Sequence, residues 1–343
     1  MTRDPVSDTI MHYRAAAEAA REAQDFKALV GIGDQLERHM DFPQAWRCLA
    51  DGAAGMARRK KTVSGREWNG ETDPGRLLLV LRLMRHVGAQ LRMARAVARL
   101  ARSGLQIILC VEPRLKELFS RSFPEITVVD TAQADRLLQD CDYWASYERI
   151  AQFCWTSALE IETDFQPLQA NPGRVAQLRE AYGWSPGRLH IGISWYSSND
   201  RKDLPTPENW HHTLTDIDHQ ILSLQYNPQE ANTVEFSKQA GCDLLVDPKI
   251  DPVNDLDGCA AQIATTDVVL TISNTTAHMA GAMGHRCIVL LDDKDHLIWP
   301  KGSDRSVYYP KTTLLRQAGR PWSEVMRAAT VLLEDMSNEA VQR

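Results

Sequence analysis

Short, continuous apolar runs alternate with segments of helical periodicity along most of the chain. A first series places apolar runs at 76–83, 106–111, 126–129 and 143–144, with helical patterns at 89–103 and 113–123 between them. A proline-bearing connection at 165–172 leads to a second series, with runs at 189–195, 220–224, 242–246, 267–271, 286–291 and 313–316 and a last helix at 322–333. Strands that are apolar on both faces and alternate with helices are typical of parallel sheets covered by helices. The sequence therefore predicts an α/β protein with two doubly wound, Rossmann-like domains.

Residues 9–60 carry only helical patterns. A helix is predicted from Phe26 to His39, and another begins at Pro43, which suits the first turn of a helix. The segment Pro43-x-Ala45-Trp46-x-x-Leu49-Ala50 resembles the start of a tetratricopeptide repeat, although an unrelated helical cap is the alternative. One and a half repeats do not make a stable solenoid, so we expect these helices to dock on the next domain. The predicted division is 1–61, 66–165 and 173–335, with the last helix a candidate to pack back on the first α/β domain.

Composition narrows the class of protein. The 343 residues carry a net charge of −6, with 43% hydrophobic and 24% charged residues, which is typical of a globular protein and gives no basis for nucleic-acid binding. No apolar run is long enough to cross a bilayer, and the N-terminus has no apolar signal core, so we expect a cytoplasmic protein. Seven cysteines without a Cys-x-x-Cys pair indicate reduced thiols.

Polar residues follow several predicted strands of the second domain. The run at 267–271 leads into Ser273, Asn274, Thr275 and Thr276, with His278 one turn further along a helix of small residues. Open parallel sheets bind ligands at the carboxyl ends of their strands, where helix N-termini offer free N–H groups to phosphates. This turn therefore predicts a site for a phosphate-bearing ligand. Simple helix capping is the alternative for Ser273 and Thr276, and ordinary packing is the alternative for His278.

Arginines dominate the start of the first α/β domain. Between Arg76 and Val111 there are seven arginines and no acid, and the helix at 89–103 presents Arg92, Arg95, Arg99 and Arg102 at helical spacing. A positive wall for an anionic ligand is one interpretation, on the acceptor or phosphate side of a site. A solvated helix face is at least as good an interpretation for Arg99 and Arg102. Arg85 and His86 lie at the carboxyl end of a predicted strand, which favours a role in a site.

A resemblance to a known family runs along residues 66–330. The segment from Ser273 to Gly284 resembles the nucleotide-sugar motif of the bacterial lipopolysaccharide heptosyltransferases (glycosyltransferase family 9), and more closely the tetratricopeptide-linked proteins with a heptosyltransferase-like or O-GlcNAc-transferase-like region. Further matches occur in the same order along the chain, at Trp68-Asn-Gly70, Ala94-Arg95, Gly192-x-x-Trp195, Ser223-Leu-Gln225, Tyr308-Tyr-Pro310 and Leu315-Arg-Gln317. The resemblance implies the GT-B architecture, in which two Rossmann-like domains face a cleft.

The resemblance also implies roles for individual residues. Ser197, Ser198 and Lys202 match residues that face the donor phosphates. Ser273, Asn274 and Thr275 match the turn that receives the pyrophosphate, with His278 beside it. Gln225 and Glu230 lie where the family contacts the base or ribose. Hydroxyl, N–H and ammonium donors suit a leaving diphosphate on chemical grounds as well.

One departure concerns the catalytic base. The family loop after the first strand usually reads Gly-Asp, and that aspartate is taken as the base that activates the acceptor hydroxyl. Here Ala89 follows Gly88, and an alanine cannot accept a proton. His86 is the candidate to replace it, because histidine is a competent base near neutral pH. The family's aspartate at the position of Ser273 is also absent.

The first functional interpretation is an inverting glycosyltransferase that needs no cofactor and moves a sugar from a nucleotide-diphosphate donor to a hydroxyl of a protein or glycan. No metal is expected, because no Asp-x-Asp pair lies in a loop expected to face the cleft and no zinc-binding spacing occurs. The alternative is a non-catalytic module that binds a nucleotide sugar or a protein partner, the latter through the N-terminal helices. A sugar-nucleotide epimerase of the same fold is a third interpretation.

Overall fold

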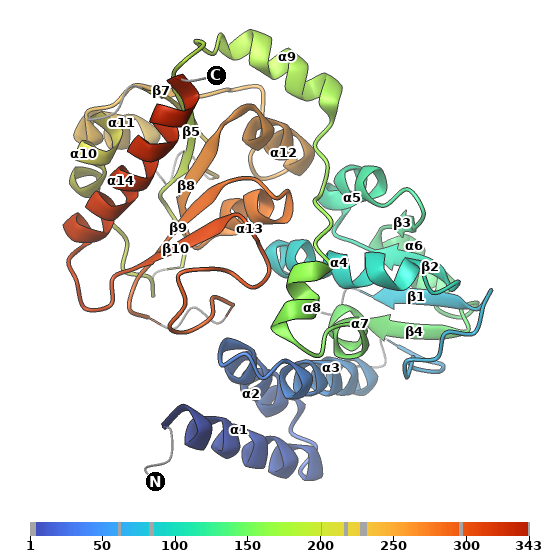
Figure 1. Cartoon of the computed structure of the whole chain (residues 1–343). Helices are drawn as coiled ribbons and strands as arrows, with labels where there is room; N and C mark the ends of the chain where they lie inside the picture. The colour runs from blue at the N-terminus through green and yellow to red at the C-terminus, as the bar shows by residue number, and fades with distance from the viewer. Residues whose placement is uncertain are drawn as a thin grey trace. The chain divides into compact units, whose positions relative to one another are not determined.

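The computed structural model describes residues 5–60, 63–81, 86–199, 201–215, 219–226, 232–294 and 298–341. Contacts divide the chain into two units, Met1–Gln166 with Leu297–Ser303 and Pro167–His296 with Asp304–Arg343. Each unit holds its own parallel sheet covered by helices, as the alternating pattern predicted (Figure 1). The expected α/β class with doubly wound sheets is thus confirmed.

The sheet of the first unit has the order β3-β2-β1-β4, with all neighbours parallel. Its elements are β1 (Leu77–Leu81), α4 (Val87–Ala101), β2 (Gln106–Cys110), the 3-10 turn η1 (Pro113–Leu115), α5 (Lys116–Ser122), β3 (Thr127–Val129), α6 (Thr131–Leu137), β4 (Tyr143–Ser146), α7 (Tyr147–Cys154) and α8 (Ala158–Thr163). Leu78, Leu79 and Val80 are fully buried, because β1 is central and covered on both faces.

Three helices precede this sheet, namely α1 (Pro5–Glu22), α2 (Phe26–Arg38) and α3 (Phe42–Arg59). α2 packs on α3, and α3 lies against α7 of the α/β domain. The ring centroids of Trp46 and Trp155 are 6.2 Å apart across this contact. The predicted docking of the N-terminal helices is therefore confirmed, and they belong to one unit with the first α/β domain. Their assignment as a tetratricopeptide repeat stays a prediction. The segment Leu297–Ser303 also joins this unit, since the Lys301 N–H donates to the Arg38 carbonyl at 3.3 Å.

Two arginines of α4, Arg92 and Arg99, pair with acids on other elements. Arg92 pairs with Glu37 of α2, and both side chains are buried. Arg95 is 1% exposed, and its guanidinium carbon lies 4.5 Å from the ring centroid of Phe165. Arg99 donates to Asp164 at 2.7 Å. Acids on distant segments therefore neutralise Arg92 and Arg99, and the Arg92–Glu37 pair ties α2 of the helical region to α4.

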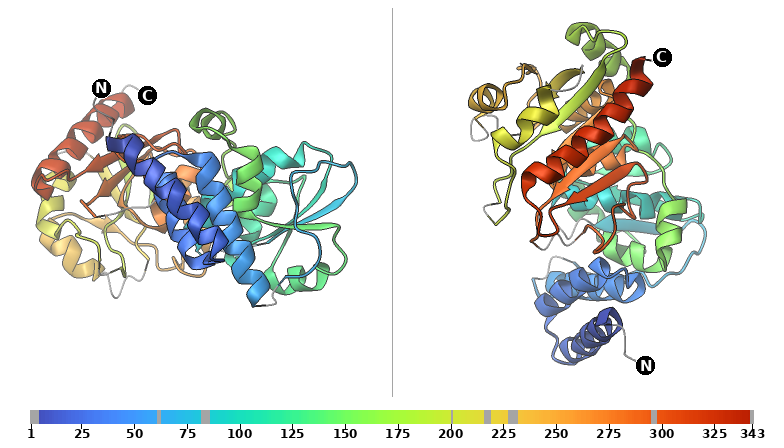
Figure 2. Two further views of the ribbon diagram at one scale, coloured as in Figure 1. Left: turned by 90° about the horizontal axis from the view of Figure 1, so that it is seen from below. Right: turned by 60° about the vertical axis from the view of Figure 1, so that its left-hand side comes forward.

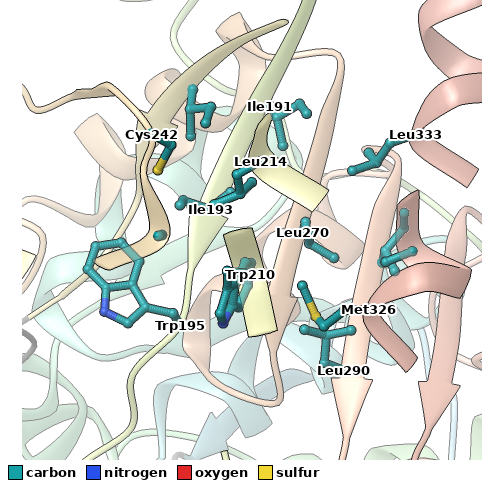
Figure 3. Close-up of a cluster of buried hydrophobic side chains, with 14 of the residues drawn as sticks. Ile191, Ile193, Trp195, Trp210, Leu214, Cys242, Leu270, Leu290, Met326 and Leu333 are labelled. Carbon is teal, nitrogen blue, oxygen red and sulfur yellow. The ribbon is translucent and has the colours of Figure 1, made fainter. Parts of the chain in front are cut away.

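The sheet of the second unit has the order β10-β9-β8-β5-β6-β7, again all parallel. Its elements are α9 (Pro172–Tyr182), β5 (Leu189–Ser194), α10 (Pro207–Thr215), β6 (His219–Ser223), α11 (Thr233–Ala240), β7 (Leu244–Leu245), α12 (Leu256–Thr265), β8 (Val268–Ile272), α13 (Thr275–Ala282), β9 (Cys287–Leu291), β10 (Thr312–Arg316) and α14 (Trp322–Val341). Figure 3 shows the apolar core on one face of this sheet, where Ile193 and Leu270 of the strands meet Trp210 of α10 and Met326 of α14.

The last helix corrects one expectation. We considered α14 a candidate to pack back on the first domain. Its apolar face, including Val325, Met326, Ala329 and Leu333, is instead buried in the core of its own sheet. α14 lies across that sheet in contact with α10, β5 and β10 (Figure 2, right). The helical periodicity identified the apolar face but carried no information on which sheet it covers.

Candidate functional site

The candidate site is built where the strand order of the second sheet reverses. β5 and β8 are neighbours, and Ser194 pairs with Thr271 at their carboxyl ends. From this point the chain runs outward to β6 and β7 on one side and to β9 and β10 on the other. Ligands of open α/β sheets bind at such a reversal point. Ser197 and Ser198, which follow β5, and the turn 273–276, which follows β8, therefore lie after neighbouring strand ends.

Asn274 fixes the start of α13. Its Oδ1 accepts the N–H of Ala277 at 3.3 Å, and its Nδ2 donates to Ser194 Oγ at 2.8 Å. Thr271 Oγ1 donates to the Ser194 carbonyl at 2.9 Å, so the ends of β5 and β8 are tied through side chains. The helix cap that we considered for Ser273 or Thr276 thus belongs to Asn274. Thr276 is buried and donates to the Leu224 carbonyl at 3.4 Å.

Lys202 brings a positive charge to this turn. Its Nζ donates to the carbonyl of Ser273. Burial lowers the pKa of the Lys202 ammonium, and the Asp292 carboxylate opposes that shift only in part. The adjacent backbone is held in place, since the Asp203 N–H donates to Asp292 Oδ2 at 2.7 Å. Lys202 and Ser273 therefore lie together at this turn.

Gln225 supports the end of β5. Its Oε1 accepts from the N–H groups of Trp195 and Tyr196, each at 2.9 Å, and from Ser194 Oγ at 3.1 Å. Its Nε2 donates to the Tyr226 and Tyr196 carbonyls at 2.7 and 3.4 Å. Gln225 is also buried, so its amide is engaged in shaping the loop that starts at Trp195. A direct contact with a base or ribose would require one of these bonds to be given up.

The remaining predicted residues of the second domain differ in exposure. Ser197 is buried, and its Oγ accepts the N–H of Asn199 at 3.3 Å. Ser198 is exposed, and its N–H donates to the hydroxyl of Tyr226 at 3.3 Å. Ser273 and Thr275 are partly exposed at the start of α13. Glu230 lies outside the described residues.

Tyr309 is a residue of the site that sequence reasoning did not assign. Its hydroxyl lies 2.7 Å from His278 Nδ1, and its ring lies against Gly281 on the same helix. His278 is partly buried, and its hydrogen bond to Tyr309 holds the ring in one orientation. The match at Tyr308-Tyr-Pro310 was the signal in the sequence, but a match alone does not show which side chain the tyrosine contacts.

The contact between Tyr309 and Gly281 leads to a prediction. A Cβ at position 281 would lie 2.4 Å from the Tyr309 ring, so Gly281→Ala forces the ring away. We expect a loss of about 1–3 kcal/mol in the free energy of unfolding, the usual cost of overpacking. Urea unfolding measures it. Gly173→Ala is the matched control, because its Cβ has only a contact of 3.4 Å with a side-chain oxygen; equal stabilities of the two variants would contradict the packing argument.

The residues predicted for the acceptor side lie in α4 or just before it in the sequence. His86 is exposed at the N-terminal end of α4, and no capping hydrogen bond from its side chain is seen within the described chain. Ala89 lies in the first turn of that helix. Arg92 and Arg95 are buried against protein groups, and Arg85 lies outside the described residues.

No three His, Cys, Asp or Glu side chains of the described residues gather in a group that would hold a metal ion. None of the described helices has the length and apolar character needed to span a membrane.

Comparisons with known proteins agree with the fold. No protein-family model matches the chain. Protein FlbA of Caulobacter vibrioides is 25% identical over 303 residues, which cover 80% of this chain and 49% of that protein, so the chain spans about half the length of this curated relative. The structure of a family 9 glycosyl transferase from Veillonella parvula aligns with a TM-score of 0.55 and 11% identity, over 82% of this chain and 98% of that one. The E. coli ADP-heptose lipopolysaccharide heptosyltransferase II aligns with a TM-score of 0.50 and 14% identity, over 76% and 99%.

The chain has the α/β fold of these two glycosyltransferases. At these identities the likeness concerns the fold, and activity has to be argued from the site. Within this fold, the turn from β8 to α13 and the loop after β5 form the candidate site, and Lys202 of the loop reaches the turn through its bond to the Ser273 carbonyl.

Proposed function

We propose that the protein is a glycosyltransferase that takes its sugar from a nucleoside-diphosphate donor bound in the second domain. The observation that carries this proposal is the meeting of Lys202 with the N-terminus of α13, beside the reversal point between β5 and β8. The first N–H groups of a helix have no acceptor within the helix, and the helix dipole adds a partial positive charge there. Together with an ammonium group, they suit a pyrophosphate.

The same groups would stabilise the leaving diphosphate. Negative charge accumulates on the diphosphate as its bond to the sugar breaks, and fixed donors aimed at that charge lower the barrier. Because burial lowers the pKa of Lys202, its charge is costly without a partner, and a bound phosphate relieves that cost. We propose on this ground that no metal ion is required. Full activity in the presence of a strong chelator would agree with this part of the proposal.

His278 is proposed as a further donor to the diphosphate. Tyr309 donating to Nδ1 would place the proton of a neutral His278 on Nε2, which then acts as a hydrogen-bond donor. The hydrogen bond at one ring nitrogen thus sets the chemistry of the other.

The acceptor side rests on His86. We propose that His86 removes the proton of an acceptor hydroxyl, on a protein or glycan, in an inverting displacement, since Ala89 cannot. His86→Ala is then expected to lower the rate of sugar transfer about 100-fold, the lower end of what general-base catalysis contributes, because the side chain is exposed. Donor affinity should be unchanged. Transfer at the full rate in this variant would rule out the role.

A non-catalytic module that binds a nucleotide sugar is the alternative, and Ala89 is the observation that favours it. Calorimetric titration with a panel of nucleotide sugars, followed by assays of donor hydrolysis and transfer, distinguishes the two. Saturable binding with neither reaction supports the module. Conversion of the donor into another nucleotide sugar without an acceptor would instead indicate an epimerase.

A further inference from the structure

We propose that the N-terminal helical region binds an acidic peptide segment of a partner protein, in a pocket distinct from the donor site. The pocket has a volume of about 400 Å³ and lies among α1, α2, α3 and α7. Four arginines line it, namely Arg21, Arg58, Arg59 and Arg149, together with a single acid, Asp51. We call this the arginine pocket. The positive charge is thus a feature of this pocket, and the whole chain carries a net charge of −6.

The apolar part of the arginine pocket is formed by Phe26. The ring lies directly on Gly55, where any Cβ would stand 2.3 Å from a ring atom. The guanidinium carbon of Arg59 lies 4.5 Å from the centre of this ring, and its NH2 group donates to the Gln24 carbonyl at 2.9 Å. Arg59 is exposed and makes no ion pair within the described part of the chain. It therefore presents a positioned cation next to an apolar surface.

The inner wall holds two arginines in fixed positions. Asp51 bridges Arg21 and Arg149, at 3.1 and 2.9 Å. Glu18 contacts Arg21 at 2.7 Å, and Glu67 contacts Arg149 at 2.8 Å and Arg58 at 2.7 Å. These acids orient the guanidinium groups and neutralise part of their charge. Arg59 and part of Arg58 remain for a ligand, since the Arg58 side chain is 56% exposed and its ion pair with Glu67 uses one NH2 group.

Charge complementarity identifies the class of ligand. Guanidinium groups bind carboxylates through paired, charge-assisted hydrogen bonds. The surface of Phe26 beside Arg59 suits the apolar part of a neighbouring residue. An acidic peptide with an aromatic residue between glutamates offers both features, and a basic segment would be repelled. The recognised feature is thus a short acidic stretch on a protein rather than a free inorganic anion.

Fluorescence anisotropy with labelled peptides tests this inference on the full chain. The probe is Glu-Glu-Phe-Glu-Glu with capped ends, and the comparison peptide carries glutamine at every glutamate. We expect saturable binding of the acidic peptide only, weakened at least 10-fold in the double variant Arg58→Glu, Arg59→Glu. Arg47→Glu, an exposed arginine on the same helix outside the pocket, should bind as the wild type does. Thermal unfolding of all variants confirms that they are folded, and the single variant Arg59→Gln, which keeps Arg58 and Glu67 paired, provides a milder change.

Three results would overturn the proposal. They are no saturable binding of the acidic peptide, equal binding by the double variant and the wild type, and competition by inorganic phosphate at concentrations as low as those of the peptide. Each of these outcomes is independent of donor binding, so the proposed function in the second domain stands or falls separately.

Discussion

Lys202→Met is expected to lower turnover of the nucleotide-sugar donor about 10²–10³-fold, the usual effect of removing one donor from a preorganised anion site. Lys202 supplies the full positive charge at the turn where α13 begins, with its Nζ at the Ser273 carbonyl. Methionine keeps the length and apolar stem of the side chain but not the charge. A diphosphate leaving the sugar would then face helix N–H groups, hydroxyls and the neutral His278, but no full positive charge. Steady-state kinetics with the donor that binds most tightly measures the effect.

The controls for Lys202 separate charge from folding. Lys238→Met, an exposed lysine on α11 in the same domain, should turn over donor at the wild-type rate. Because burial lowers the pKa of Lys202, donor affinity in the wild type should begin to fall at a pH below the ordinary pKa of a lysine, and Lys202→Met should lack this fall. A wild-type rate in Lys202→Met would remove the main support for the donor site.

Glu37→Leu is expected to lower the free energy of unfolding by about 3–5 kcal/mol, as is typical when one partner of a buried ion pair is removed. Both Glu37 and Arg92 are buried, and the variant leaves the Arg92 charge without its closest counter-charge. The Trp46 ring, 5.8 Å from the guanidinium carbon, offers only a weak substitute. Urea unfolding, followed through the tryptophan fluorescence, measures the change.

Two companion variants test whether the effect comes from the buried charge. Glu18→Leu removes an exposed acid of α1 and should change stability by less than about 1 kcal/mol. Glu37→Leu combined with Arg92→Leu should recover much of the stability, because replacing a whole buried pair by apolar residues is often neutral. A double variant as unstable as Glu37→Leu alone would show that packing, rather than charge, causes the loss.

The architecture of the sheets could be predicted because their central strands are apolar on both faces. Runs such as 77–81 and 268–272 have few other places in a fold than the centre of a parallel sheet. Long-range partners could not be predicted in the same way. Arg92 looked like a candidate for a ligand because its acid, Glu37, lies on a helix 55 positions earlier. The sheet that α14 covers could not be predicted either, because the apolar face of a helix does not show which surface it packs against.

The candidate site shows the same division. The turn from Ser273 to Thr276 could be predicted as a phosphate site because a polar segment follows a buried strand and starts a helix. The roles of the individual side chains at this turn could not be predicted from the sequence. Gln225 supports the backbone of the β5 end, Asn274 caps α13, and Tyr309 holds His278. Their side chains are of types that also bind nucleotides, and only the positions of their acceptors and donors distinguish the two uses.

A crystal structure with the nucleoside diphosphate that binds most tightly tests the central claim most directly. The proposal predicts that the pyrophosphate lies at the N-terminus of α13, within hydrogen-bonding distance of the Thr275 N–H, with Lys202 turned from the Ser273 carbonyl to a phosphate oxygen. A diphosphate bound elsewhere, or none at a concentration that saturates binding in solution, would contradict the proposed function.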